Sequence, residues 1–413
     1  MPSSSATRQG MTPLVIVLML VLLLGIQAVT TDLYLPALPS LPHELGASVG
    51  EAQLTLSALI ICFGLAQLVF GPLADRFGRR PVLLAGLALY TLASVLAALA
   101  PGIGWLIAWR ALQGAAMAAA VTCGRSIVRD LFEPHEGARI MSKALGGLGL
   151  IAMLSPLIGG LLLQWFSWRA ALVALALFGA ATLVWVAWRF EETVPRRNPQ
   201  ATRLAPLWAN WKQIARHPTF VAYTLLLAST YGGLFVMLAA SSFVFIDVLG
   251  LSRLQFGAVL AANSAAYILG TLLCRRLLAR RGLRATVALG GVLSLSGGVL
   301  LAALSLAGAQ QWSVWTVIAP MWLYALGHGI HQPCGQAGAV GPFRDKAGTA
   351  ASLSGFCMML TAFVTGLWLG RSLNGTVYPL TLGVAGFSIA VASVAWTLVQ
   401  RHGDPQPRAS ALA

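Results

Sequence analysis

Two charged side chains lie within or at the end of apolar stretches, where they could take part in moving a proton. Asp32 follows an apolar run that begins near residue 12, and Arg110 lies inside a run over 104–125. Placing such a charge within a bilayer costs about 2.5–3.5 kcal/mol on insertion scales, so charges of this kind are functional candidates. We expect Asp32 to face a water-filled cavity and to exchange a proton for a substrate. The alternative is that Asp32 only caps its helix before Pro36.

Further polar and aromatic side chains within apolar stretches are candidates for the wall of that cavity, because polar groups on membrane helices either face a cavity or bond to one another. His328 and His331 would share one helix face and could suggest a metal pair, but no third ligand accompanies them, so we expect no metal site. Arg125 and Asp247 are weaker candidates at the ends of their apolar runs. The candidate cavity residues are Tyr34, Tyr231, Phe235, Asn263, Tyr267 and His331.

The elements that must position these residues are membrane helices. Of the 413 residues, 58% are hydrophobic and 9% are charged, a composition that excludes a water-soluble globular domain. A helix needs about 20 apolar residues to cross a hydrocarbon core about 30 Å thick. The predicted fold class is an all-α polytopic membrane protein with 12 transmembrane helices, near residues 12–30, 50–72, 81–100, 104–125, 143–165, 169–190, 219–242, 254–274, 285–307, 313–333, 348–370 and 376–399.

The basic residues predict the orientation of these helices. The formal net charge is +15, yet the basic residues do not gather on one stripe among aromatic residues, so we expect no nucleic-acid partner. If the N-terminus is cytoplasmic, all 27 Lys and Arg except Arg110, Arg169, Arg253 and Arg371 lie in or beside cytoplasmic segments. This positive-inside pattern predicts a multi-pass protein of the bacterial inner membrane with both termini in the cytoplasm. Arg8 precedes the first span, but no small-residue cleavage site follows it, so we expect no cleaved signal peptide.

The longest polar interruption divides the chain into two halves of six predicted helices. We expect an N-terminal bundle over 1–190, a cytoplasmic linker over 191–218 and a C-terminal bundle over 219–413. A basic connection follows the second span of each half, over 71–81 and over 274–284, which is a weak internal repeat. Paired bundles with a site near the midplane are typical of secondary transporters.

The connection over 71–81 has a composition suited to a turn between two helices. Gly71 would let helices approach closely, Gly78 would allow a tight turn, and Asp75 could accept hydrogen bonds from a helix N-terminus or an arginine. Arg76 and Arg79 would hold the segment on the cytoplasmic side, and a plain positive-inside loop is the alternative. The order of residues resembles the G-x-L-x-D-R-x-G-R-R/K signature of the major facilitator superfamily. The resemblance implies that this segment latches the two halves in the outward-facing state, with Asp75 and Arg79 as latch residues.

Two further stretches resemble motifs of the same superfamily. The run from Arg110 to Gly114 resembles R-x-x-Q-G, which implies that Arg110 organises the proton pathway by bonding backbone carbonyls or the first helix. A packing anchor is the alternative role for Arg110. The fifth span resembles the motif of proton-coupled antiporters, whose glycines and proline would let this helix bend and pack closely against a partner. The matching residues are Gly149, Pro156, Gly159 and Gly160.

Three short stretches narrow the resemblance to the Bcr/CflA group of drug exporters. Thr31–Pro39 resembles D-M/I-Y-L-P-A-x-P, Glu191–Pro195 resembles E-T-x-P, and Gly348–Ser352 resembles G-T/S-A-x-A/S. The resemblance implies the major facilitator fold and a proton-coupled antiporter that exports small hydrophobic drugs, phenicol-like or bicyclomycin-like, by alternating access. The alternative is a dedicated exporter of a metabolite such as an amino acid, a sulfur compound or a nucleoside.

The expected partners follow from this resemblance and from motifs that the sequence lacks. The sequence contains neither the phosphate-binding loop of ATPases nor a catalytic pair, so we expect neither ATP-driven pumping nor enzyme activity. We expect no cofactor, with the proton gradient as the energy source. The expected partners are a small-molecule substrate, protons and the lipid bilayer, and similar transporters imply a monomer.

Overall fold

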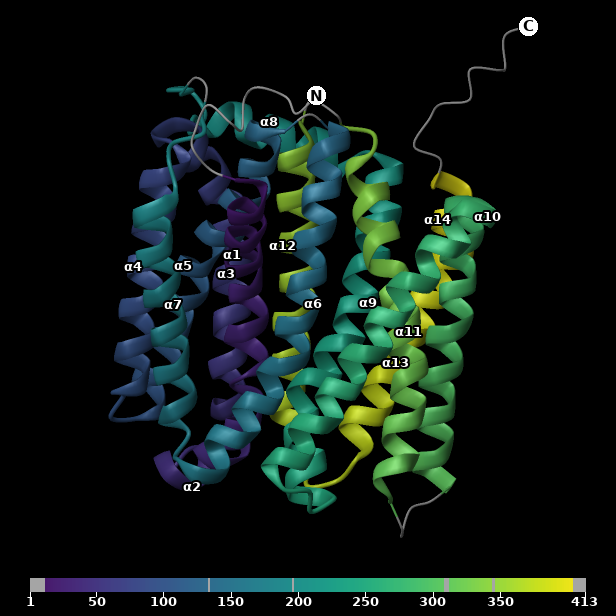
Figure 1. The fold of residues 1–413 in the computed structure, drawn as a ribbon. Coiled ribbons are helices and arrows are strands. Elements are labelled where there is room, and N and C mark those ends of the chain that lie inside the picture. The colour runs from purple at the N-terminus through teal and green to yellow at the C-terminus, as the bar shows by residue number, and fades with distance from the viewer. Residues whose placement is uncertain (1–11, 133, 195–196, 308–311, 344–345, 404–413) are drawn as a thin grey trace, which may run out of the picture. The chain divides into compact units, whose positions relative to one another are not determined.

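A computed structural model describes the chain over residues 12–132, 134–194, 197–307, 312–343 and 346–403. Over these residues the chain forms helices and short connections, without a β-strand (Figure 1). Arg8 and Pro195, which the sequence analysis names, lie outside the described residues, as do the outer ends of the two predicted bundles.

The long helices of the described residues match the predicted transmembrane helices. Ten of them are long and apolar enough to cross a membrane. One of these ten, α10 (Arg253–Ala307), contains the non-helical residue Gly282 and so consists of two legs, which fit the predicted spans at 254–274 and 285–307. The remaining long helix is α11 (Val314–Val340). The prediction of 12 transmembrane helices is therefore confirmed.

The first compact unit comprises Met1–Leu204 and Leu251–Ala261. Within it, α5 packs against α3 and α4, α1 packs against α6, and α4 packs against α7. Small residues allow close packing, because Gly114 lies directly against the backbone of Leu59 and Gly86 lies against Ala119. The long helices of this unit are α1 (Pro13–Asp32), α3 (Val49–Phe77), α4 (Arg79–Ala98), α5 (Ile103–Leu131), α6 (Pro134–Trp165) and α7 (Arg169–Arg189).

The second compact unit comprises Ala205–Gly250 and Ala262–Ala413. Its central helix is α9 (Pro218–Ser242), which packs against α11, α12 and α13 and continues into the π-helix η3 (Phe243–Val248). Gly232 and Gly233 of α9 lie against the rings of Phe387 and Tyr324. The other helices of this unit are α8 (Leu204–Ala215), most of α10, α12 (Ala347–Ser372), α13 (Tyr378–Trp396) and α14 (Leu398–His402).

The two basic connections are almost entirely helical, which corrects the expectation of loops there. Helix α3 continues to Phe77 and α4 begins at Arg79, so Gly78 alone lies between them, with φ 105°. In α10 the chain turns at Gly282, with φ 72°. Each turn needs only one residue in the left-handed region, which glycine adopts without a steric penalty, so polar helix ends replace the expected loops.

The chain after α1 forms a compact buried segment. Asp32 is the last residue of α1, and a 3₁₀-helix, η2 (Leu35–Ser40), follows and leads into the short helix α2 (Leu41–Leu45). All six residues of η2 are buried, including Pro36 and Pro39. Proline has no N–H group to leave unpaired, so two prolines within six buried residues reduce the number of backbone donors that need partners.

Candidate functional site

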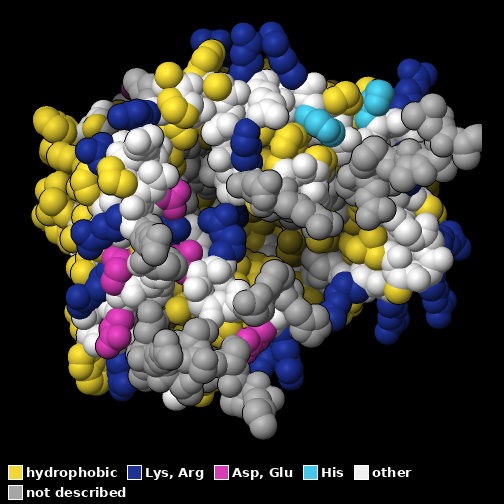
Figure 2. All heavy atoms as spheres, turned by 90° about the horizontal axis from the view of Figure 1, so that it is seen from above, with side chains coloured by type: hydrophobic (Ala, Val, Ile, Leu, Met, Phe, Trp, Pro, Cys, Tyr) yellow, Lys and Arg dark blue, Asp and Glu magenta, His cyan; other side chains and the backbone are white. Residues whose placement is uncertain are grey.

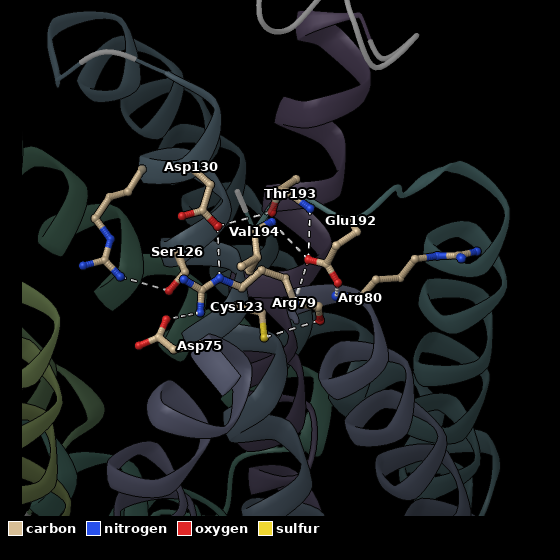
Figure 3. A network of polar contacts seen from close by, with 10 residues as sticks. Asp75, Arg79, Arg80, Cys123, Ser126, Asp130, Glu192, Thr193 and Val194 are labelled. Atoms are coloured by element: carbon tan, nitrogen blue, oxygen red, sulfur yellow. Dashed lines mark hydrogen bonds and ion pairs between the residues drawn. The ribbon is translucent and has the colours of Figure 1, made fainter. Parts of the chain in front are cut away.

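Arg79 joins three helix ends of the first unit through its guanidinium group. Its Nη1 lies 2.6 Å from Asp75 Oδ1, at the end of α3, and its Nε donates to Asp130 Oδ2 at 3.0 Å, at the end of α5 (Figure 3). The side chain of Arg79 is buried. Removing one of the two carboxylates weakens the charge compensation of this buried guanidinium, which makes the contact costly to disrupt. We call Asp75, Arg79, Asp130, Glu192 and Thr193 the corner cluster.

Glu192 caps the first turn of α4 from the segment that follows α7. One of its carboxylate oxygens accepts a hydrogen bond from Arg79 N at 2.8 Å, and the other accepts from Arg80 N at 3.2 Å (Figure 3). Gly78, the N-cap of α4, has no side chain to bond these donors. A carboxylate at this position satisfies free N–H groups and stabilises the positive end of the helix dipole. Thr193 Oγ1 donates to Asp130 Oδ2 at 3.3 Å and closes the cluster.

The two glycines of the predicted latch differ in whether a side chain would fit at their positions. A Cβ at Gly78 would meet the Glu192 carboxylate, and its φ of 105° is unfavourable for any other residue. A Cβ at Gly71 would meet only the Thr122 methyl group at 3.8 Å, an ordinary contact. Among the described residues of the first unit no helix approaches Gly71 closely, so a close approach at this position stays a prediction, whereas the tight turn expected at Gly78 is present.

Arg76 lies outside the corner cluster but also fixes the segment after α7. Its Nη1 donates to Thr202 Oγ1 at 2.6 Å, and Asn198 N donates to Asp75 O at 2.9 Å. Glu192, and not Asp75, accepts hydrogen bonds from the N-terminus of α4, and among the described residues the Asp75 carboxylate pairs with Arg79. Of the five predicted latch residues, the structure brings Asp75, Gly78 and Arg79 together at one place.

Arg110 lies in a fully buried polar network between α1, α4 and α5. Its Nη1 donates to Gln113 Oε1 one turn later, and its Nη2 donates to the carbonyl oxygen of Thr30 in α1 at 3.2 Å. Its guanidinium carbon lies 4.2 Å from the centre of the Tyr34 ring. The expected bond between Arg110 and the first helix is therefore present. Its charge is stabilised by dipoles and an aromatic face, since no carboxylate pairs with it among the described residues.

The partners of Arg110 bond onward to α4 and α3. Gln113 Nε2 donates to Ser94 Oγ at 2.6 Å, and Thr30 Oγ1 lies 2.7 Å from Tyr90 OH. Tyr34 OH donates to Thr55 Oγ1 of α3 at 3.0 Å. These bonds fix the end of α1 to two neighbouring helices.

Asp32 stands apart from this network. Its carboxylate accepts a hydrogen bond from Thr31 Oγ1 at 2.8 Å and has no ion-pair partner among the described residues. The side chain is half-buried, whereas Tyr34 and Arg110 are fully buried. Asp32 and Arg110, the two charged candidates of the first unit, thus form no ion pair with each other.

The glycines of the antiporter motif place α6 against backbone rather than side chains. Gly159 lies directly against the carbonyl of Leu33, one residue after Asp32, and Gly160 lies against the carbonyl of Arg253 at the start of α10. Arg253 Nη1 in turn donates to Leu163 O of α6 at 2.6 Å. Pro156 lies inside α6 with its carbonyl against Gly257, and Gly149 is half-buried two turns earlier. These close approaches occur only because the positions lack a side chain.

Most of the predicted cavity residues are buried in this structure. Tyr231 and Tyr267 are half-buried, and Tyr231 makes contacts of its own. Phe235 is 1% exposed and Asn263 is 5% exposed, as part of the core of the second unit. Substrate contact by these residues stays a prediction.

The two histidines of α11 face different helices. His331 Nε2 lies 3.2 Å from Val287 O in the second leg of α10. His328 Nδ1 lies 3.0 Å from Thr230 Oγ1 of α9, and its ring lies 5.4 Å from the ring of Tyr267. The described residues contain no group of three or more His, Cys, Asp or Glu side chains that could hold a metal ion.

Four residues that complete these sites are not predicted from the sequence. Asp130 follows Arg129 at the end of its apolar run, and Glu192 lies in the E-T-x-P stretch, but neither position indicates a bond to Arg79 in sequence. Gln113 belongs to the R-x-x-Q-G stretch, and its spacing from Arg110 places both on one helix face. Tyr90 carries no sequence signal, because a lone tyrosine in an apolar helix is most often packing.

Comparison with known proteins supports the architecture. Residues 20–366 match the family described as the Major Facilitator Superfamily. A chloramphenicol resistance protein of Pseudomonas aeruginosa is 32% identical over 79% of this chain and 76% of its own length. Multidrug resistance protein D of Escherichia coli K12 is 30% identical over 82% of this chain and 84% of its own length. A solved D-xylose–proton symporter superposes with a TM-score of 0.72 at 14% identity, covering 94% of this chain and 99% of that one, which shows the fold alone.

Proposed function

The chain belongs to the Major Facilitator Superfamily, and on that premise we propose that it exports small hydrophobic drug-like molecules in exchange for protons. Relatives named for resistance to chloramphenicol and to multiple drugs favour a phenicol-like cargo over a dedicated metabolite. One observation carries the proton part of the proposal: Asp32 ends a membrane helix, and among the described residues its carboxylate is bonded by the neighbouring Thr31 hydroxyl alone. No cofactor enters the proposal.

Asp32 is suited to gain and lose a proton because its charge is not needed to balance another one. Arg110 is bonded by Gln113 and by the Thr30 carbonyl and lies over the Tyr34 ring. Protonation of Asp32 therefore leaves no buried cation without compensation. Asp32 is not among the fully buried residues of the first unit, and the proposal requires that water reach its carboxylate during the transport cycle.

The charge of Asp32 can act on the contact between α1 and α6. The residue after Asp32 is Leu33, whose carbonyl lies against Gly159 of α6, and the next residue is Tyr34, which lies beneath Arg110. A change of hydration or position at Asp32 would therefore alter both the contact between Leu33 and Gly159 and the contact between Tyr34 and Arg110. We infer that Arg110 keeps this junction ordered while Asp32 alternates between protonated and charged forms, and that proton and substrate bind in turn.

We propose that the corner cluster is the portion of the predicted latch that lies within the first unit. Arg79 links the ends of α3 and α5, and Glu192 links the start of α4 to the segment after α7. Four chain segments are thereby joined by charge-assisted bonds, which are stronger than neutral ones. We infer that the intact cluster stabilises one state of the transport cycle.

The proposed setting is the bacterial inner membrane with both termini in the cytoplasm, and the proposed working form is a monomer. The distribution of Lys and Arg supports this orientation. A cysteine introduced near residue 403 should react with a membrane-impermeant thiol reagent in everted vesicles and not in intact cells. Reaction only in intact cells would reverse the orientation.

Proton release from acid-loaded everted vesicles tests the proposed cargo. Phenicols, bicyclomycin, cationic dyes and metabolites would be added in turn to vesicles with and without the protein. We expect phenicols or bicyclomycin to release protons only where the protein is present. A response confined to an amino acid, a sulfur compound or a nucleoside would replace the drug exporter with a metabolite exporter, and no response to any compound would contradict proton antiport.

A further inference from the structure

The turn of α10 at Gly282 has a counterpart in the turn at Gly78, yet the two differ in charge compensation. Both turns follow the second long helix of a half and depend on one glycine with positive φ. At Gly78 the arginine is bonded by carboxylates of the corner cluster. Around Gly282 the sequence offers no neighbouring carboxylate, because no Asp or Glu occurs between residues 248 and 344.

Four arginines beside Gly282 are exposed. The side chains of Arg275, Arg276, Arg280 and Arg281 form no hydrogen bond or ion pair with any residue that the structure describes. On the face of the molecule that Figure 2 shows, Lys and Arg side chains predominate over Asp and Glu. Four like charges within seven residues repel one another, so a bound anion would stabilise them.

An apolar stripe leads directly to two of these arginines. Leu269 and Leu273 are 58% and 36% exposed, and Arg276 and Arg280 continue the same helix face at the next turns. These four positions are spaced by four, three and four residues, as on one side of an α-helix. The face thus changes from exposed leucine to exposed arginine along the axis of a helix long and apolar enough to cross a membrane.

We propose that this face binds an anionic phospholipid of the surrounding bilayer. The lipid phosphate would lie between Arg276 and Arg280, whose planar guanidinium groups can bond phosphate oxygens in pairs. One acyl chain would lie along Leu269 and Leu273. A phospholipid is the occupant that matches both parts of the face, since a free anion has nothing to cover the leucines. Basic clusters directly beside a membrane helix recognise anionic headgroups in this way.

Native mass spectrometry of the purified full-length protein tests the proposal by titration with phosphatidylglycerol and phosphatidylcholine. Each arginine that contacts the anionic headgroup strengthens binding about fivefold, so Arg276→Gln with Arg280→Gln should weaken phosphatidylglycerol binding about 25-fold. The matched control is Arg275→Gln with Arg281→Gln, which removes the same charge from the same turn but off the leucine stripe. It should weaken binding less than fivefold. Phosphatidylcholine should bind weakly to all forms.

Three results would overturn the proposal. These are equal binding of the two lipids by the wild type, an equal loss in the two double variants, or glycerol phosphate binding as tightly as the whole lipid. The last result would indicate a site for free anions. Arg276→Lys with Arg280→Lys keeps both charges and serves as the control for misfolding. It should retain phosphatidylglycerol binding within about tenfold. A loss as large as that of the glutamine pair would also contradict the charge-based account.

Discussion

Replacing Glu192 with glutamine removes the carboxylate that caps α4 and leaves the shape of the side chain almost unchanged. In the wild type its two oxygens accept from Arg79 N at 2.8 Å and from Arg80 N at 3.2 Å. The amide of Glu192→Gln keeps one acceptor but turns an N–H group toward the other backbone donor. A lost cap costs about 1 kcal/mol, and the lost charge at the helix N-terminus costs about 0.3–1 kcal/mol. We expect a total destabilisation of about 1–2 kcal/mol.

The matched control is Glu191→Gln, which removes the same charge from the neighbouring, exposed residue. Thermal unfolding followed by tryptophan fluorescence should show a Tm lower by about 2–8 °C for Glu192→Gln, on the scale for units of about 150–250 residues. Glu191→Gln should change stability by less than about 0.5 kcal/mol. Hydrogen exchange should also become faster at the amides of Arg79 and Arg80. Equal melting of the two variants, with both amides still protected, would refute the capping role.

Three further predictions concern the two networks of the first unit. Asp130→Asn should destabilise the protein by about 1–3 kcal/mol, because Arg79 loses one of two charged partners, and chemical unfolding in detergent should show it. Gly78→Ala should cost about 1–3 kcal/mol through backbone strain, whereas Gly71→Ala should stay within about 0.5 kcal/mol; equal Tm values would contradict this. Arg110→Lys keeps the charge but loses the guanidinium group that bonds Gln113 and the Thr30 carbonyl at the same time. Vesicles should therefore retain the inserted protein but lose drug-driven proton release.

Apolar length was enough to predict the helices, because a helix that crosses a bilayer must satisfy its own backbone groups. The same reasoning placed Arg110 inside a helix, where the structure has it fully buried. The segment 71–81 shows the limit of composition, since charged residues that read as a loop continue the helices up to Gly78. Helix ends outside the hydrocarbon core can be polar, and hydropathy does not distinguish them from loops.

The partners of each site depend on contacts between residues far apart in the chain. Glu192 reaches Arg79 across 113 residues, and the Thr30 carbonyl reaches Arg110 across 80. Contacts between residues so far apart along the chain produce no periodic pattern in a single sequence. His328 and His331 show a related limit, because spacing of three suggests one face while their rings bond to different helices. Only the packing of the neighbouring helices decides these directions.

The central claim is that Asp32 carries the proton that drives export. Proteoliposomes containing the wild type should accumulate a phenicol against its gradient when a pH gradient is imposed. Asp32→Asn should still exchange labelled for unlabelled phenicol but lose accumulation, because only the carboxylate can gain and lose a proton. Glu44→Gln removes an exposed acid from the same end of the first unit and should accumulate phenicol like the wild type. Accumulation by Asp32→Asn at the wild-type level would contradict the claim.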